Sequence, residues 1–367
     1  MPIYKTGKTK DGKTQYRVTH NYTDSTGNYK QISKLVYGLP EAKQTEIQLM
    51  HKTRETPNNI TVQSLYDNYI LAKSHEVRES SLGKIKSVLS NNVLPYLSKT
   101  KLDKLNAHTL QNWKNKISEA DTKISTKQNV YKEFRAMLNF AVKMDYIQSN
   151  PLLKVGNFKD AYNLNKPEEK IQYYTPDEFK KFISVIPDED FNYFVFFNIA
   201  FYTGLRKGEN NALDWIALSG NKLTVSRSVT QKIKGKEPVF TPPKNASSYR
   251  TLQIPKQLLD ILNEQKKRQQ KNSKKWSSNF LICGGAKCLS DTSISNKNIQ
   301  YANVAELHHI RIHDFRHTHA TLLINEGINI QEIARRLGHT DVNITWKTYA
   351  HLYPREEERA IKVLENL

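Results

Sequence analysis

Two short polar segments divide this chain and limit how it can fold. Residues 55–59 combine a proline with two asparagines, and residues 155–170 are polar and charged. Such composition is typical of linkers between folded parts, and a chain of 367 residues is long enough for two or three domains. We therefore expect domains at residues 1–55, 60–152 and 173–367, with residues 153–172 as the second linker.

The first two parts carry different local patterns. Residues 15–20 and 30–36 are rich in β-forming side chains, turn signals lie at 10–12 and 24–27, and a helix is expected near 40–52. Residues 60–152 instead repeat apolar side chains at helical spacing. This predicts helices near residues 62–74, 80–94, 107–118 and 125–145.

The third part mixes both patterns. Thr175 to Glu178 read as a capping box with a proline, which predicts a helix start, and the apolar run 191–205 predicts a buried helix too short to cross a membrane. Strands are expected at 223–229 and 251–254, and helices at 256–271 and from 313 onward. The fold class is therefore multidomain, mainly α with small β-sheets (α+β).

The charge of the chain points to a polyanionic partner. The formal net charge is +20 and the isoelectric point about 9.6. The basic excess is spread over all three parts, so we expect each of them to contact phosphate; a lysine-rich soluble surface is the alternative. Two cysteines and a charged N-terminal segment without an apolar stretch predict a cytoplasmic protein with no membrane partner.

Four short motifs in the third part carry the chemistry. They read TGLRKGE with Arg206, HDFRHTHA with His313 and Arg316, LGH with His339, and TWKTYAH with Tyr349. Phosphodiester cleavage passes through a phosphorane with extra negative charge, which fixed guanidiniums stabilise. His313 and Arg316 are three positions apart, so on a helix they share one face. This set suits attack on a phosphodiester by a tyrosine without a metal or another cofactor.

Together these motifs closely resemble those of the tyrosine recombinases, the phage integrase family, in order and rough spacing from Thr175 to Tyr349. The resemblance implies that Arg206 and Arg316 clamp the phosphate, that His313 assists proton transfer and that His339 donates to the phosphate. Tyr349 would be the nucleophile, forming a 3′-phosphotyrosyl link that reseals without ATP; Tyr301 and Tyr353 are its nearest rivals.

The same resemblance assigns supporting residues. Glu209 would orient the site, and Lys244, in a hairpin motif, would protonate the leaving 5′-oxygen. Asn245 departs from the family's usual threonine, Asn210 and Asn211 from its usual apolar residues, and three other hairpin lysines compete with Lys244. His317 and His319 are assigned to packing or to supporting contacts. The competing lysines are Lys232, Lys234 and Lys236.

The other parts resemble the family's DNA-binding modules. Residues 1–55 are similar to a three-stranded arm-binding domain, and residues 60–152 to the helical core-binding domain that grips the duplex. Residues 173–367 would form the mixed α/β catalytic domain, ending in a short helix from 354 to 367 that packs on its own or on a neighbouring subunit. The expected DNA contacts are Tyr16, Arg17, Lys30, Lys34, Lys84, Lys86, Lys123, Lys127 and Lys132.

The expected function is site-specific recombination that integrates or excises a mobile element. The partners implied are double-stranded DNA with arm-type and core-type sites, three further copies in a tetramer, and an excision factor or a host DNA-bending protein. Rival hypotheses are a chromosome-dimer resolvase, a type IB topoisomerase-like enzyme and a regulator that binds DNA without cleaving it. A zinc site at Cys283 and Cys288 is disfavoured, because four residues separate them rather than two.

Overall fold

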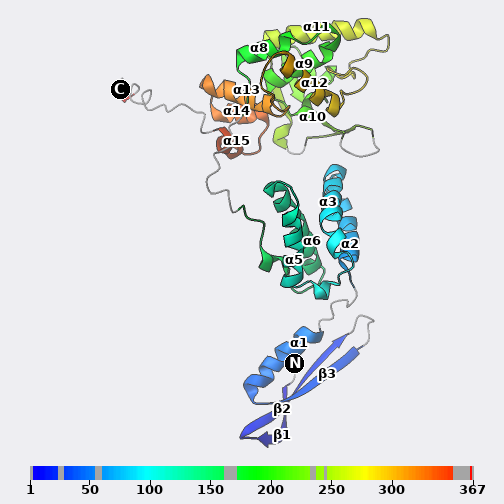
Figure 1. Ribbon diagram of the computed structural model, residues 1–367, viewed down its shortest axis with the longest axis vertical. Coiled ribbons are helices and arrows are strands. Elements are labelled where there is room, and N and C mark those ends of the chain that lie inside the picture. Colours follow the sequence, from blue (N-terminus) through cyan, green and yellow to red (C-terminus); the bar gives the residue numbers. More distant parts are fainter. Residues whose placement is uncertain are drawn as a thin grey trace. The chain divides into compact units, whose positions relative to one another are not determined.

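The computed structural model describes residues 3–23, 29–53, 60–160, 172–231, 237–243, 246–349 and 364–365 (Figure 1). Its contacts divide the chain into two compact units, Met1–Lys166 and Pro167–Leu367. Helices dominate the described residues, and small antiparallel sheets occur in both units. The predicted fold class, a multidomain and mainly α chain with small sheets, is confirmed.

The first unit begins with a three-stranded antiparallel sheet and a helix that packs on it. The elements are β1 (Ile3–Lys10), β2 (Lys13–Thr23), β3 (Tyr29–Tyr37) and α1 (Leu39–Thr53). Asp11 and Gly12 adopt φ angles of 48° and 73°, as a tight turn between twisted strands requires. The apolar pattern did not reveal β1, because lysine, threonine and glycine dominate it.

A helical bundle follows in the same unit. Its longer helices are α2 (Val62–Glu76), α3 (Glu79–Asn92), α5 (Ala107–Glu119) and α6 (Ile124–Lys143). The bundle also contains the short α-helices α4 (Leu94–Leu97) and α7 (Leu152–Val155) and a 3₁₀ helix, η1 (Leu102–Lys104); the label η marks 3₁₀ helices throughout. The four predicted helices are confirmed. Thr61 and Asn106 cap the N-termini of α2 and α5. In the core, the rings of Trp113 and Phe134 pack edge to face with their centroids 4.9 Å apart.

The segment that follows the bundle differs from the expected linker. Phe158 is only 4% exposed and packs edge to face on Trp113, and the Lys114 ammonium donates to the carbonyl oxygens of residues 155, 156 and 157. The packing of Phe158 and the hydrogen bonds from the partly buried Lys114 therefore hold residues 155–158 on the helical bundle. The remainder of both expected linkers, residues 54–59 and 161–171, lies outside the described residues.

The second unit surrounds an aromatic core with helices. Phe182, Phe197, Tyr301 and Phe315 are at most 1% exposed and pack together there. The first part of the unit contains α8 (Pro176–Ser184), η3 (Asp188–Asp190), α9 (Phe191–Thr203), α10 (Lys207–Asn210) and η4 (Trp215–Ala217). The predicted capping box at Thr175 and Glu178 is present, and the apolar run forms the buried helix α9.

The strands and the last helices of this unit carry the motif residues. Strands β4 (Leu218–Ser219), β5 (Lys222–Val225) and β8 (Arg250–Gln253) form one sheet, and β6 (Ser228–Thr230) and β7 (Val239–Thr241) form a hairpin. The remaining elements are η5 (Ala246–Ser248), α11 (Lys256–Asn272), α12 (Asp291–Val304), α13 (Asp314–Asn325), α14 (Ile330–Leu337) and α15 (Val342–Tyr349). Figure 1 shows α13, α14 and α15 side by side at one end of the unit.

Candidate active site

The motif residues come together within the second unit. Arg206 precedes α10, His313 and Arg316 lie at the start of α13, His339 follows α14, and Tyr349 ends α15. The charges of both arginines act on the His339 ring, and the charge of Arg316 acts on the Tyr349 phenol. Two guanidiniums, two imidazoles and a phenol that are far apart in sequence therefore share one electrostatic environment.

Glu209 connects two arginines at this site. Its side chain is buried, and its oxygens accept from Arg206 Nη1 at 2.8 Å, from the Arg206 backbone N–H at 3.1 Å and from Arg250 Nη2 at 2.9 Å. Burial alone would raise the pKa of Glu209, but the two guanidiniums outweigh it and hold the pKa below its usual range. The ionised carboxylate fixes the direction in which Arg206 points.

Arg250 is a site residue that the sequence analysis did not single out. It is 5% exposed and donates from Nε to the Arg336 carbonyl at 2.6 Å and from Nη1 to the Ser248 carbonyl at 3.0 Å, besides binding Glu209. All three nitrogens are therefore used within the protein. The available signal was its position as the last residue of the hairpin motif that contains Lys244.

Two motif glycines allow the side chains of Arg250 and His319 to approach the backbone closely. Gly338 has φ of +68°, and a Cβ there would lie 2.8 Å from Arg250 Nη1. Gly204 has φ of +65°, and a Cβ there would lie 2.8 Å from His319 Cδ2. Both positions thus require glycine for conformation and for space, which explains the glycines of the LGH and TGLR motifs.

Replacing Gly338 with alanine is expected to destabilise the second unit and to displace Arg250. The left-handed conformation alone costs a non-glycine residue about 1–3 kcal/mol, and the clash with Arg250 adds to it. Gly220→Ala is the matched control, because Gly220 has φ of +57° but nothing within 4 Å of a Cβ. Urea unfolding should show a larger loss for Gly338→Ala than for Gly220→Ala; equal losses would contradict the close contact with Arg250.

Arg316 is a buried cation with an incompletely satisfied fork. It is 3% exposed, and Nη1 donates to the Gly204 carbonyl at 2.9 Å, whereas the buried Nη2 has no hydrogen-bond partner among the described residues. Burial, followed by repulsion from Arg206, lowers the pKa of Arg316 to about 9. A guanidinium in this setting gains from a bound anion, since an anion would offset both the desolvation and the repulsion.

The two motif imidazoles are neutral at pH 7 in this environment. Desolvation within the site and then Arg316 lower the pKa of His313, although its side chain is exposed on the surface, and burial and Arg316 lower the pKa of His339 to about 4. His339 Nδ1 lies 2.7 Å from the Thr345 hydroxyl, which fixes the ring. A phosphate between the arginines would raise both pKa values, so each ring is suited to donating a hydrogen bond to it.

Tyr349 is buried at the end of α15, and its hydroxyl has a defined partner. The side chain is 2% exposed and joins the small core of α13 and α14 that includes Ile324 and Leu337. Its Oη lies 2.6 Å from Nδ1 of His317. Burial raises the pKa of the Tyr349 phenol. His317, assigned from the sequence to packing or to a supporting contact, therefore touches the hydroxyl of the predicted nucleophile.

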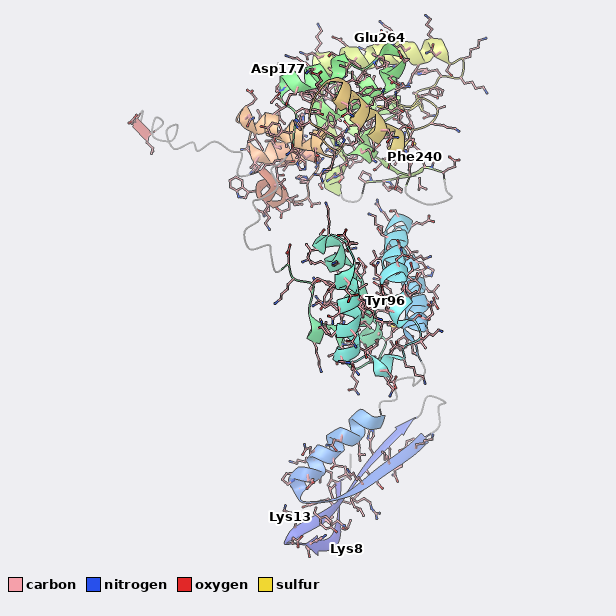
Figure 2. The ribbon with its side chains drawn as sticks, in the orientation of Figure 1. Lys8, Lys13, Tyr96, Asp177, Phe240 and Glu264 are labelled. Carbon is pink, nitrogen blue, oxygen red and sulfur yellow. The ribbon has the colours of Figure 1, made fainter. Side chains whose placement is uncertain are left out.

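The hairpin that precedes the Lys244 motif is anchored close to Arg206. A Cβ on Gly208 in α10 would lie 2.7 Å from the Val229 carbonyl, so α10 and β6 are in tight contact. Arg227 donates to the Ala212 carbonyl and lies 5.1 Å from the ring of Phe240, which Figure 2 labels on β7. The predicted proton donor and its competitors, Lys244, Lys232, Lys234 and Lys236, lie outside the described residues.

The residues expected to contact DNA in the first sheet do not share one face. Tyr16 pairs with Val36, and Val18 pairs with Lys34, so these residues project toward α1, where Val18 and Val36 form the core. By the same alternation Lys30 projects to that side. Arg17 projects from the opposite, open face. Tyr16 packs against the core, which makes it a less accessible contact than the sequence alone indicated.

The lysines expected to contact DNA in the helical bundle lie on its surface. Lys84 and Lys86 are exposed on α3, Lys123 precedes α6, and Lys132 is exposed on α6. Lys127 instead donates to the Ser118 carbonyl at 2.6 Å. Its ammonium is thus already engaged in connecting α6 to α5.

The cysteines have contacts within the fold rather than with each other. Cys283 is buried, burial raises the pKa of its thiol, and its sulfur lies 3.8 Å from Asn210 Oδ1. Cys288 accepts from Gln231 Nε2 at 3.3 Å. The described part of the chain contains no group of three or more histidines, cysteines or acidic residues able to hold a metal ion.

Across the same residues, no helix is long and apolar enough to cross a membrane.

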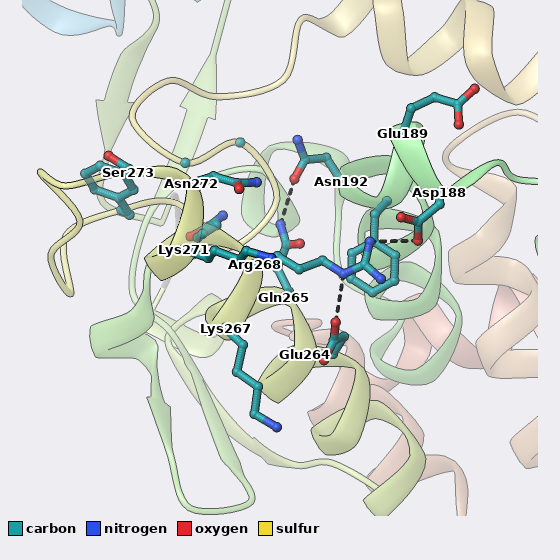
Figure 3. Close-up of a pocket in the computed structure, with 15 residues that line it drawn as sticks. Asp188, Glu189, Asn192, Glu264, Gln265, Lys267, Arg268, Lys271, Asn272 and Ser273 are labelled. Atoms are coloured by element: carbon teal, nitrogen blue, oxygen red, sulfur yellow. Dashed lines mark hydrogen bonds and ion pairs between the residues drawn. The ribbon is translucent and has the colours of Figure 1, made fainter.

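A cavity of about 850 Å³ lies away from the motif residues, between η3, α9 and α11 (Figure 3). Arg268 lies across it, paired with Asp188 at 2.7 Å and Glu264 at 2.9 Å, and its guanidinium is 3.9 Å from the Phe191 ring. Buried Gln265 binds Asn192 at 2.7 Å in its wall. The charges in this cavity neutralise one another, unlike the cationic cluster around Arg316.

Comparisons with known families and proteins identify relatives of this chain. Residues 172–356 match the model of the phage integrase family, and residues 61–118 match the N-terminal SAM-like domain of phage integrases. The ICEBs1 integrase of Bacillus subtilis is 26% identical over 98% of this chain and 99% of its own length. A XerC-like tyrosine recombinase of Caldanaerobacter subterraneus is 26% identical over 99% of both chains.

Solved structures of DNA integrases share the fold of this chain. The Tn1549 transposon integrase in complex with transposon right end DNA matches with a TM-score of 0.64 at 21% identity, over 84% of this chain and 99% of that one. A lambda integrase tetramer bound to a Holliday junction matches with a TM-score of 0.58 at 16% identity, over 92% and 93%. The chain belongs to the phage integrase family of tyrosine recombinases, site-specific enzymes that cleave and rejoin DNA.

Proposed function

We propose that this recombinase integrates and excises a phage or another mobile element, with Tyr349 as its nucleophile. The observation that carries the proposal is the convergence of Arg206, Arg316, His313 and His339 in the same unit as a buried tyrosine. The integrase names of its relatives support the role in a mobile element.

The proposed chemistry follows from the charges at the site. Arg206, held by Glu209, and Nη2 of Arg316, which no described residue binds, contact the non-bridging oxygens of the scissile phosphate and stabilise the phosphorane. His313 assists proton transfer and His339 donates to the phosphate. Tyr349 Oη bonds to phosphorus, and the 5′-oxygen leaves with a proton from Lys244. The phosphotyrosyl bond conserves the energy of the phosphodiester, so rejoining needs no cofactor.

The proposed division of labour follows the three folded parts. Residues 1–55 bind arm-type sites, residues 60–152 bind the core site, and residues 173–367 cleave and rejoin the DNA. Residues 153–172 join the core-binding part to the catalytic part. Four copies act together on two duplexes, as the lambda integrase tetramer on a Holliday junction suggests. The tail from 354 to 367, of which only 364–365 is described, packs on its own or a neighbouring subunit.

An excision factor or a host DNA-bending protein sets direction in this proposal, and the reaction takes place in the cytoplasm of a bacterial host. Bacterial and prophage relatives support the host assignment. Exposed Lys30, Lys34, Lys84, Lys86, Lys123 and Lys132, together with exposed Arg17, remain the proposed phosphate contacts.

Recombination between two DNA fragments tests this proposal. One fragment carries the junction of the circularised element that encodes the protein, and the other carries its chromosomal target. The parent protein should yield recombinant fragments and Holliday-junction intermediates, and Tyr349→Phe should bind both fragments without producing either. A parent that relaxes supercoils but never exchanges strands would favour a type IB topoisomerase-like enzyme, and binding without any cleavage would favour a regulator.

A further inference from the structure

The proposed chemistry leaves unused a close contact at the site, the pair formed by His317 and Tyr349. His317 lies one residue after Arg316 on α13, and Tyr349 is the last residue of α15. The 2.6 Å separation of Nδ1 and Oη is a short hydrogen bond, and the rings meet edge to face at 5.5 Å. The hydroxyl is thus held in one direction.

The protonation states of the pair decide which group donates. Burial raises the pKa of the Tyr349 phenol, and burial followed by His313 lowers the pKa of His317 to about 4. Both groups are therefore neutral at pH 7. With the ring proton on Nε2, the phenol donates to Nδ1, and the lone pair that accepts this bond is also the base that could remove the proton.

The surroundings of His317 favour a base that becomes stronger when DNA binds. The His313 ring lies 5.3 Å away. Burial is the main cause that lowers the pKa of the imidazole, and the charges of Arg311 and Arg316 add to it. An added phosphate anion would offset these charges and raise the basicity of the ring. The titratable and charged groups that act on His317 are His313, Asp314, Arg311 and Arg316 from its own segment and Tyr349 from α15.

We propose that His317 is a catalytic residue that takes the phenolic proton from Tyr349 during cleavage and returns it during rejoining. This inference rests on the proposal that Tyr349 is the nucleophile. In cleavage, the bond from Tyr349 Oη to phosphorus forms and the bond from phosphorus to the 5′-oxygen breaks. The phenolic proton moves to His317 Nδ1, and the 5′-oxygen takes its proton from a separate donor. Rejoining reverses each transfer.

Single-turnover cleavage of a nicked target duplex, measured from pH 6.5 to 9, tests the role of His317. His317→Ala is expected to cleave about 10²–10⁴-fold more slowly at pH 7, the usual contribution of a general base. Its rate should rise about tenfold per pH unit as hydroxide replaces the missing base, whereas the parent should remain nearly flat. Free imidazole should partly restore the variant, because the substitution leaves space for it.

Control variants distinguish a wrong assignment of the nucleophile from a wrong assignment of the base. His309→Ala removes an imidazole that lies outside this pair and should cleave as the parent does. A covalent adduct that persists in Tyr349→Phe would remove the nucleophile assignment and this inference with it. An adduct lost in Tyr349→Phe but formed at the parental rate by His317→Ala would overturn this inference alone. So would a slow His317→Ala that responds to neither pH nor imidazole, since that would indicate a structural role.

Discussion

Replacing Arg316 with lysine is expected to reduce single-turnover cleavage by about 10³-fold, the upper range for losing one preorganised donor to a developing oxyanion. A lysine keeps the positive charge but offers no planar fork, so it cannot bind the Gly204 carbonyl and a phosphate oxygen together as Nη1 and Nη2 can. DNA affinity should change only slightly, because one phosphate contact among many is altered. The adduct formed on a nicked duplex measures cleavage, and a mobility shift measures binding.

Arg268→Lys is the matched control for this substitution. Arg268 is bound to Asp188 and Glu264 in the cavity of Figure 3, away from the site, so its replacement should leave the rate of cleavage unchanged. If Arg316→Lys cleaved as fast as Arg268→Lys, the proposed phosphate clamp would be wrong. If instead Arg316→Lys lost DNA binding in proportion to cleavage, Arg316 would serve binding rather than the transition state.

Replacing Glu209 with glutamine is expected to destabilise the second unit by about 3–5 kcal/mol, the usual cost of removing one partner from a buried ion pair. The substitution leaves Arg250, which is 5% exposed, without a counter-charge, and Arg206 without its orienting carboxylate. Cleavage should fall as well. Urea unfolding, monitored by hydrogen exchange in peptides from residues 172–349, measures the stability of the second unit separately from that of the first.

The pH dependence of this effect has a definite sign. The folded pKa of Glu209 lies below its usual range, so its stabilising contribution is complete above the unfolded value of about 4.3 and disappears as the pH falls through the folded pKa. The gap between parent and Glu209→Gln should therefore be constant from pH 6 to 8 and narrow below about pH 4. Glu332→Gln, which removes an exposed pair with Arg335, should cost less than about 1 kcal/mol. Equal losses for the two variants would contradict the buried network.

Local patterns in the sequence predicted most of the elements correctly. Helical periodicity gave α2, α3, α5 and α6, and Thr175 with Glu178 gave the start of α8, because caps and apolar faces are encoded within a few residues. The family resemblance implied a third strand in the N-terminal sheet, but the local pattern did not locate β1, because its side chains are mostly polar and it forms by pairing with β2. Residues 155–160 were taken for a linker because the burial of Phe158 depends on Trp113.

At the candidate site too, local motifs could be predicted from the sequence and contacts between distant segments could not. The motifs named Arg206, His313, Arg316, His339 and Tyr349 in advance, since each lies in a recognisable short sequence. The contact between Tyr349 and His317 and the binding of Glu209 by Arg250 join segments separated by 32 and 41 positions. Such contacts depend on how α13, α15 and β8 pack, so local sequence patterns could not predict them.

The most direct test of the account is to identify the residue that becomes bonded to DNA. A nicked duplex carrying the end of the element is incubated with the protein in a chelator, and the adduct is digested and sequenced by mass spectrometry. We expect a nucleotide joined through its 3′-phosphate to Tyr349 in the digested peptide, and no adduct from Tyr349→Phe. An adduct on Tyr301 or Tyr353, or cleavage that requires a divalent metal, would contradict it.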